Sequence, residues 1–257
     1  MPILFSFNCL AYKSEWLVPY KNIEGIHGLD FWSGYSFFKS PWVIAPATTK
    51  ARDGLGPLFN ARSCDACHQN GAGGTTKDGG LAFVMRIGDD ANHAVLERYG
   101  QQLQLFAIKN IARGATVKPE VRLQLAWHQQ EVTLSAKTFT VKTPVYTLTD
   151  KAYGDIPDVT PLSFRIAPPL YGLGLIDAVA EKTLFSRHDP NDEDADGISG
   201  RVNKVWDIKK PMHVAGRFGL KNEQTNLLQQ IAGAFSEDIG ISSSFFPQQN
   251  CVKQQKK

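Results

Sequence analysis

Apolar and polar residues alternate along residues 120–149, and this alternation is the clearest secondary-structure signal in the chain. From Val121 to Trp127 every second residue is apolar, which is the period of a strand with one buried face. The pattern predicts three or four antiparallel strands. His128 follows the first run beside two glutamines, so we expect it at a surface turn and not as a ligand.

Two further segments have the spacing of amphipathic helices. One covers residues 173–179 and is expected to end near His188, and the other covers residues 227–235. Residues 236–246 are predicted to form a loop, as is the glycine-rich stretch at residues 53–80, which suits a loop that wraps a flat group. These patterns predict an α+β fold, a mainly helical and loop-rich single domain over residues 1–257, with an inserted antiparallel β-hairpin or meander at about 120–149.

Composition and charge narrow the class of protein. The chain has 257 residues, of which 42% are hydrophobic and 21% charged, as in ordinary globular proteins. The formal net charge of +3 is too small and too evenly spread to indicate a nucleic-acid partner. No run approaches the ~20 apolar residues of a transmembrane segment. The basic residues at the C-terminal end are expected to be a solvated tail.

The strongest chemical signal is the sequence Cys64-Asp65-Ala66-Cys67-His68, which fits the attachment motif of c-type haem. Two thiols three positions apart can each add to one vinyl group of the porphyrin, while the adjacent imidazole reaches the iron. We therefore expect one covalent haem c, with His68 as the iron ligand. A redox Cys-x-x-Cys, a zinc site and a local disulfide are the alternatives, but the chain offers no βαβ context and no second Cys/His pair.

An acidic loop supplies a second candidate metal site. Residues 192–197 read Asp-Glu-Asp-Ala-Asp-Gly, which is the first half of a calcium-binding loop. Asp192, Asp194, Asp196 and the carbonyl of Ile198 are the predicted ligands. The twelfth position is Asn203 instead of the bidentate glutamate of an EF-hand, so the choice lies between a structural calcium site and a solvated acidic turn.

With these motifs in view, the chain resembles the di-haem oxidoreductase family, also described as thiol oxidoreductases or peroxidases. The family is distantly related to bacterial di-haem cytochrome c peroxidases and to the methylamine-utilisation di-haem enzyme. The resemblance is carried by GYSFF (34–38), ARDGLGPLFNARSC (51–64) running into Cys67-His68, APPLYGLGL (167–175), DADGISGRVN (194–203) and GRFG (216–219).

The resemblance implies a second haem domain after the region of Cys251, and the chain has a single Cys-x-x-Cys-His. We therefore expect it to correspond to the N-terminal haem portion, with electrons supplied by that missing domain or by a redox partner protein. Apolar residues that would face such a partner are expected to be exposed: Ile239, Ile241, Phe245 and Phe246. Haem attachment implies a periplasmic or otherwise extracytoplasmic protein, although no export signal is visible in the sequence.

Candidate residues for catalysis follow from side-chain type. Heterolysis of the O–O bond of a small oxidant such as peroxide requires a polar group to move a proton, and the candidates are Glu237, Arg86 and His93. Arg62 and Arg165 are candidates for contacts with the haem propionates. In the alternative function, a closed six-coordinate electron carrier, Met85, Met212 or a histidine would occupy the sixth position of the iron. Thiol-disulfide exchange through Cys64 and Cys67 remains as a third alternative, in the absence of haem.

Overall fold

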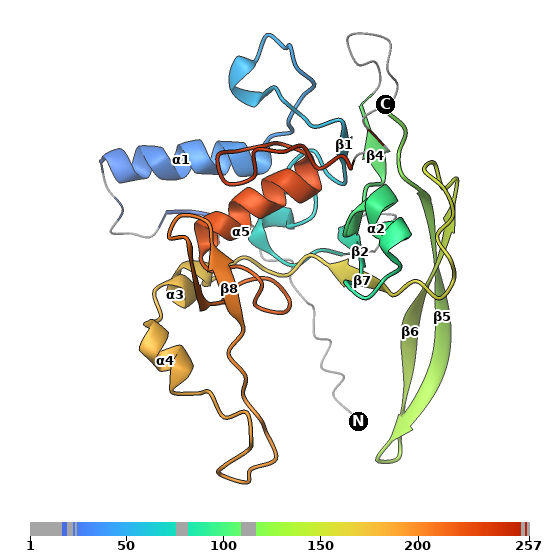
Figure 1. Ribbon diagram of the computed structural model, residues 1–257, viewed down its shortest axis with the longest axis vertical. Coiled ribbons are helices and arrows are strands. Elements are labelled where there is room, and N and C mark those ends of the chain that lie inside the picture. The colour runs from blue at the N-terminus through green and yellow to red at the C-terminus, as the bar shows by residue number, and fades with distance from the viewer. Residues whose placement is uncertain are drawn as a thin grey trace, which may run out of the picture.

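The architecture comes from a computed structural model of the chain. It describes residues 17–19, 23, 25–75, 82–108, 117–252 and 255. Gly79 and Gly80 of the predicted glycine-rich loop, Cys9, and most of the basic C-terminal end lie outside the described residues. Figure 1 shows small sheets and short helices joined by long loops, with the hairpin β5–β6 extending from the rest of the molecule.

The prediction of a mainly helical domain is wrong, because 23% of the chain is helical and 26% lies in strands. The strands form four small antiparallel sheets among the described residues: β1–β4, β3–β2–β7, β5–β6 and β8–β9. The helices are mostly one or two turns long, and such short helices depend on tertiary packing for stability. Their bounds are α1 Ile26–Lys39, α2 His93–Tyr99, α3 Leu173–Asp177, α4 Glu181–Phe185 and α5 Leu227–Ala234, with 3₁₀ turns η1 Lys50–Arg52 and η2 Gln69–Gly71.

The alternating segment forms two long strands instead of three or four short ones. Strand β5 (Arg122–Leu134) pairs with β6 (Lys137–Thr149) along its whole length. The turn between them places Ser135 and Ala136 at positive φ, as the two-residue turn of a hairpin requires. His128 therefore lies in the middle of β5, opposite Thr143, and not at a turn, although it is exposed as predicted.

The main hydrophobic core lies between the three-stranded sheet and α2. Strand β2 (Phe83–Ile87) is central, with β3 (Gln102–Leu103) on one side and β7 (Leu162–Ile166) on the other. Met85, Val95 and Tyr99 are among its fully buried residues. Three residues at the base of the hairpin, Leu123, Tyr146 and Leu148, also pack against this core, which anchors β5 and β6 to the body.

The segment predicted as one helix at residues 173–188 is two short helices, α3 and α4, separated by residues 178–180. Helix α5 begins after Asn226, whose side chain accepts a hydrogen bond from the Gln229 N–H. It continues into a π-helix, η4 (Phe235–Ile239), where the sequence predicted a loop. A π-helical turn within a helix often marks a functional position.

A second hydrophobic cluster lies beside the haem motif. Leu55, Phe59 and Ile239 form it, and Cys64 and Trp42 are among the residues that pack against it. Ile239 is only 2% exposed, and Ile241, Phe245 and Phe246 are partly buried, so the expected exposed apolar patch at these residues is not present.

The remaining strands are short pairs. Strand β1 (Leu58–Phe59) pairs with β4 (Phe106–Ala107), and β8 (Lys204–Asp207) pairs with β9 (Met212–Ala215). In the described part of the chain, no helix has the length and apolar character needed to cross a bilayer.

Candidate functional site

The haem-attachment motif forms a single helical turn. The N–H groups of Cys67 and His68 both donate to the carbonyl of Cys64, at 3.1 and 2.8 Å. Ser63 stabilises the start of the turn, because its hydroxyl accepts the N–H of Ala66 at 3.2 Å. The side chains of Cys64, Cys67 and His68 are partly buried. Local hydrogen bonds therefore close the backbone turn that carries the two thiols and the imidazole.

The orientation of His68 is set by a residue one hundred positions away. Its Nδ1 lies 2.7 Å from the carbonyl oxygen of Pro168. A carbonyl oxygen only accepts, so Nδ1 carries the proton and Nε2 is the nitrogen left to bind a metal. Hydrogen bonding of the second ring nitrogen to a carbonyl is the usual way in which proteins orient a ligating histidine. Burial lowers the pKa of His68, and the hydrogen bond to Pro168 opposes that shift.

Several contacts hold the Pro168 segment against the haem motif. The N–H of Gly74 donates to Ala167 at 2.7 Å, and the N–H of Leu170 donates to Gly71 at 2.9 Å. The Tyr171 hydroxyl donates to the carbonyl of Asn70 at 3.0 Å. Two of the sequence motifs, CDACH and APPLYGLGL, thus lie side by side and form one site.

The two thiols lie in a partly apolar and negatively charged environment. Burial raises the pKa of Cys64 and of Cys67 to about 11, and the negative charge of Asp238 adds to both shifts. Asp238 belongs to the π-helix η4, and burial raises the pKa of its own carboxyl to about 6. Ile239 of the same π-helix belongs to the hydrophobic cluster against which Cys64 packs, so the π-helix lies close to the haem-attachment motif.

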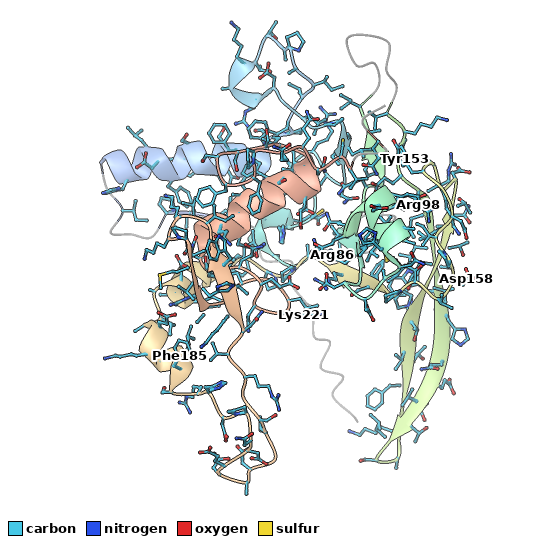
Figure 2. All side chains as sticks on the ribbon, viewed as in Figure 1. Arg86, Arg98, Tyr153, Asp158, Phe185 and Lys221 are labelled. Atoms are coloured by element: carbon cyan, nitrogen blue, oxygen red, sulfur yellow. The ribbon has the colours of Figure 1, made fainter. Side chains whose placement is uncertain are left out.

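Glu237, next to Asp238, was a catalytic candidate from the sequence. The structure brings it together with a second catalytic candidate, Arg86. Arg86, in the centre of Figure 2, donates from β2 to the Glu237 carboxylate in an ion pair. Gln102 joins the same group through its side-chain amide, 2.7 Å from Asp238 Oδ1. The Glu237 side chain is 47% exposed, and it lines a cavity of about 320 Å³ that Gln104 and Phe246 also line.

The third catalytic candidate, His93, lies apart from Glu237 and Arg86. It begins helix α2, where its exposed imidazole lies 3.7 Å from Glu97. Met85, an alternative iron ligand, is fully buried in the main core, and Met212 is 54% exposed on β9. The structure therefore groups Glu237 with Arg86 and leaves His93 apart.

The two arginines proposed for the haem propionates already have partners. Arg62 Nε donates to the carbonyl of Trp42 at 3.1 Å, and Arg165 Nε donates to the hydroxyl of Ser163 at 3.4 Å. By contrast, two buried donors near the motif have no partner: Trp42 Nε1 and Arg52 Nη1. Unpaired buried donors of this kind fit an anionic group such as a haem carboxylate. Neither residue was singled out from the sequence, because an unsatisfied donor appears only in three dimensions.

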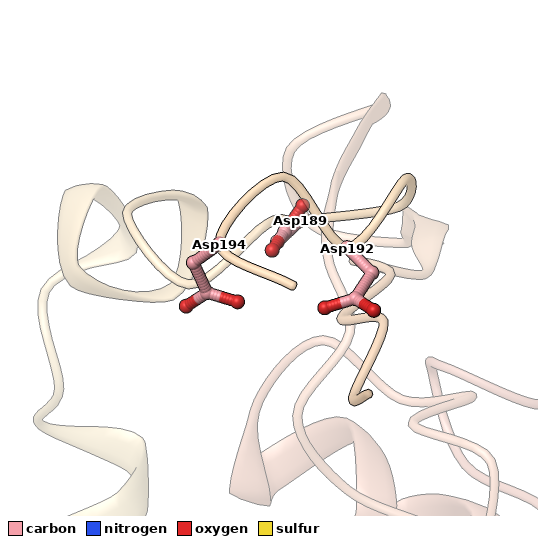
Figure 3. A group of neighbouring side chains, drawn as sticks. All are labelled: Asp189, Asp192 and Asp194. Atoms are coloured by element: carbon pink, nitrogen blue, oxygen red, sulfur yellow. The ribbon is translucent and has the colours of Figure 1, made fainter. Parts of the chain in front are cut away.

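The acidic loop brings three carboxylates together, as Figure 3 shows. Oxygens of Asp189, Asp192 and Asp194 lie within 4.8 Å of one another. Asp189 was not among the predicted ligands, and Asp196, which was, instead accepts the N–H of Ile198 at 2.7 Å. Both oxygens of the Asp192 carboxylate also accept the backbone N–H of Gly197.

Comparison with known protein families finds one match, in the second half of the chain. A family model described as "di-haem oxidoreductase, putative peroxidase" matches residues 128–254. This match confirms the resemblance to the di-haem oxidoreductase family seen in the motifs. The match includes APPLYGLGL, DADGISGRVN and GRFG, and begins after Cys64–His68. No curated protein and no solved structure matches the chain.

Proposed function

We propose that the chain binds one haem covalently through Cys64 and Cys67, with His68 as the axial ligand, and acts in the reduction of a small oxidant such as peroxide. A redox partner protein or a second haem domain supplies the electrons, and the protein functions outside the cytoplasm, where c-type haem is attached. The family match supports an oxidoreductase.

The observation that carries this proposal is the hydrogen bond between His68 and Pro168. It fixes the tautomer in which Nε2 is available to a metal, and it does so in a motif whose cysteine spacing fits the vinyl groups of haem. It also explains why two distant family motifs occur together, since one supplies the ligand and the other orients it.

When bound, the haem supplies an iron that exchanges electrons and accepts a small ligand. Reduction of peroxide to two waters consumes two electrons and two protons, so the protein must provide a proton carrier. Glu237 is our candidate, because its carboxylate is half exposed on a cavity and is positioned by Arg86. Gln102 and Asp238 belong to the same polar group, because the Gln102 amide donates to Asp238.

The two alternative functions have less support. A nucleophilic cysteine needs a lowered pKa, whereas burial raises the pKa of both thiols to about 11. A methionine-ligated electron carrier would need Met85 or Met212, but Met85 packs in the main core and Met212 is on the exposed strand β9. These placements give no support to a methionine as the sixth ligand of the iron.

The acidic loop completes the proposal. We include calcium as a structural ion there, because three carboxylates within 4.8 Å of one another supply the oxygen ligands that calcium prefers.

A pyridine haemochrome spectrum of the acid-denatured protein, expressed with a haem c maturation system, tests the central claim. Haem that remains attached after extraction is the expected result, and mass spectrometry should show the mass of one haem per chain. A high-spin ferric spectrum should then accompany peroxide reduction with a reduced cytochrome as donor. Absence of covalent haem would disprove the proposal, and a low-spin ferric spectrum would favour the electron carrier.

A further inference from the structure

We infer that Trp42 and Arg52 form the seat for the propionate carboxylates of the haem, an inference that rests on the function proposed above. The ligand class is a pair of aliphatic carboxylates on a flat aromatic ring. The inference concerns how this chain holds that end of the cofactor, which the attachment motif does not determine.

Trp42 and Arg52 each have a buried hydrogen-bond donor that lacks an acceptor. Trp42 Nε1 and Arg52 Nη1 are shielded from solvent and have no hydrogen-bond partner. Among the described residues, Arg52 also makes no ion pair with a carboxylate, although its other terminal nitrogen donates to the Ser36 hydroxyl. Arg52 is partly buried as a whole, and leaving a shielded donor of a charged group unpaired is unfavourable, so the pair calls for an anionic partner.

One aromatic ring connects the two side chains. The guanidinium of Arg52 lies over the ring of Phe37, 5.3 Å from its centroid. The same ring stacks against Trp42, with centroids 5.8 Å apart and planes 17° apart. Phe37 therefore holds the indole and the guanidinium on its surface at fixed positions. A seat of this kind is preorganised, since neither donor must move far to bind a carboxylate.

The seat is built on the backbone that leads into the attachment motif. The N–H of Trp42 donates to the carbonyl of Arg62 at 2.7 Å, and the N–H of the next residue, Val43, donates to the carbonyl of Arg52 at 3.0 Å. Trp42 and Cys64 pack against the same cluster, which contains Phe59 and Ile239. Trp42, which carries one of the two unpaired donors, and Cys64 thus border one apolar cluster, as a haem between them requires.

The chemistry of the donors suits propionates in particular. A guanidinium forms strong, charge-assisted hydrogen bonds with carboxylates, and an indole N–H is a donor only, so it also selects an acceptor. The arginines expected from the sequence, Arg62 and Arg165, already donate within the protein. Arg52 is the arginine near the motif whose terminal nitrogen is buried and unpaired.

The test uses the haem-loaded protein and the variants Arg52→Gln, Arg52→Lys and Trp42→Phe. Arg165→Gln tests the alternative arginine. Arg122→Gln is the neutral control, because the Arg122 side chain is 71% exposed on the hairpin. Haem content, the propionate bending modes in resonance Raman spectra, and the midpoint potential as a function of pH are measured for each. A thermal melt of each variant checks that it is folded.

We expect every variant to keep its covalent haem. Arg52→Gln should shift the propionate modes and lower the midpoint potential, because loss of a positive charge favours ferric haem, and it should make the potential pH-dependent where the carboxylates titrate. Arg52→Lys should restore most of the potential, and Trp42→Phe should shift the Raman modes alone. Arg122→Gln should match the wild type.

The inference is overturned if Arg52→Gln has the spectrum and potential of the wild type, or if Arg165→Gln alone shows the effects described. The Arg52 variants decide the matter even if Trp42→Phe does not fold. Failure of the proposed function is distinguishable, since it would appear as absence of covalent haem in the wild-type protein.

Discussion

Gly56 and Gly240 meet backbone to backbone at the edge of the candidate site. A Cβ built on Gly56 would lie 2.2 Å from the carbonyl oxygen of Gly240, and Gly240 itself has a φ of +76°. The Gly56 N–H donates to Ile239, and the N–H groups of Asn60 and Ala61 both donate to Asp238. This close approach holds the π-helix, with Glu237 and Asp238, against the segment that leads into the haem motif.

Gly56→Ala should therefore destabilise the fold, because the added methyl group cannot fit without moving the backbone of Gly240. A loss of about 1–3 kcal/mol in the free energy of unfolding is expected, measured by urea denaturation. Gly34→Ala is the matched control, since nothing lies within 4 Å of a Cβ at that position in α1, and it should be neutral or stabilising. Equal stability of the two variants would contradict the close contact.

Replacing both Cys64 and Cys67 with alanine should abolish covalent haem, because no thiol then remains in the motif to bond to the vinyl groups. His68→Ala should keep the haem and change its ligation, seen as a shifted Soret band. His128→Ala is the control, as His128 lies exposed in β5, and its spectrum should equal that of the wild type. Covalent haem in the double cysteine variant would refute the attachment site.

Glu237→Gln removes the proposed proton carrier and leaves a side chain of nearly the same shape. Peroxide reduction should fall by roughly 100-fold or more, while haem content and the midpoint potential change little. Steady-state kinetics with a reduced cytochrome as donor measures the effect, and His93→Gln, remote on α2, should retain activity. If His93→Gln lost activity and Glu237→Gln retained it, His93 and not Glu237 would be the proton carrier.

Glu120 makes the stability of the fold depend on pH. It is 1% exposed, and burial raises its pKa from 4.5 to about 8, although hydrogen bonds from Gln104 and Gln255 oppose the shift. Since the folded state keeps a proton that the unfolded state has lost, stability should fall as the pH rises from about 4.5 to about 8.

The slope should reach at most about 1.4 kcal/mol per pH unit. Urea denaturation between pH 6.5 and 8 isolates Glu120 from Asp238, whose pKa is about 6. Glu120→Gln should have a flatter profile in this range, whereas Glu131→Gln, an exposed residue on the hairpin, should keep the wild-type slope. A wild-type slope of zero or of the opposite sign would contradict the burial of an ionisable carboxyl.

Calcium should raise the melting temperature through binding to the folded state, and chelator should reverse the effect. Asp189→Asn and Asp194→Asn should abolish the shift if the ligands are the carboxylates that lie together. Asp196→Asn should keep the calcium-dependent shift if these three carboxylates are the ligands. It should lose the shift if the ligands are those predicted by the sequence, which include Asp196 and Ile198. An unchanged melting curve in calcium and in chelator would leave the loop as an acidic turn.

The sequence by itself determined the features that depend on neighbouring residues. The spacing of Cys64, Cys67 and His68 predicts a haem-attachment turn, and that turn is closed by hydrogen bonds within the motif. The alternation at residues 120–149 predicts antiparallel strands, because period-two alternation is a local property of strands. The family was also recognisable from short motifs, which depend on residue identity and order.

Tertiary structure alone decided what depends on residues far apart in the chain. The mainly helical prediction failed because local periodicity does not show that β2 pairs with β3 and β7, or that residues 173–188 break into two helices. The contacts of His68 with Pro168, and of Arg86 with Glu237, join positions 100 and 151 residues apart. The unpaired donors of Trp42 and Arg52 follow from what surrounds them after folding, since burial and hydrogen-bond satisfaction are properties of packed neighbours and not of sequence spacing.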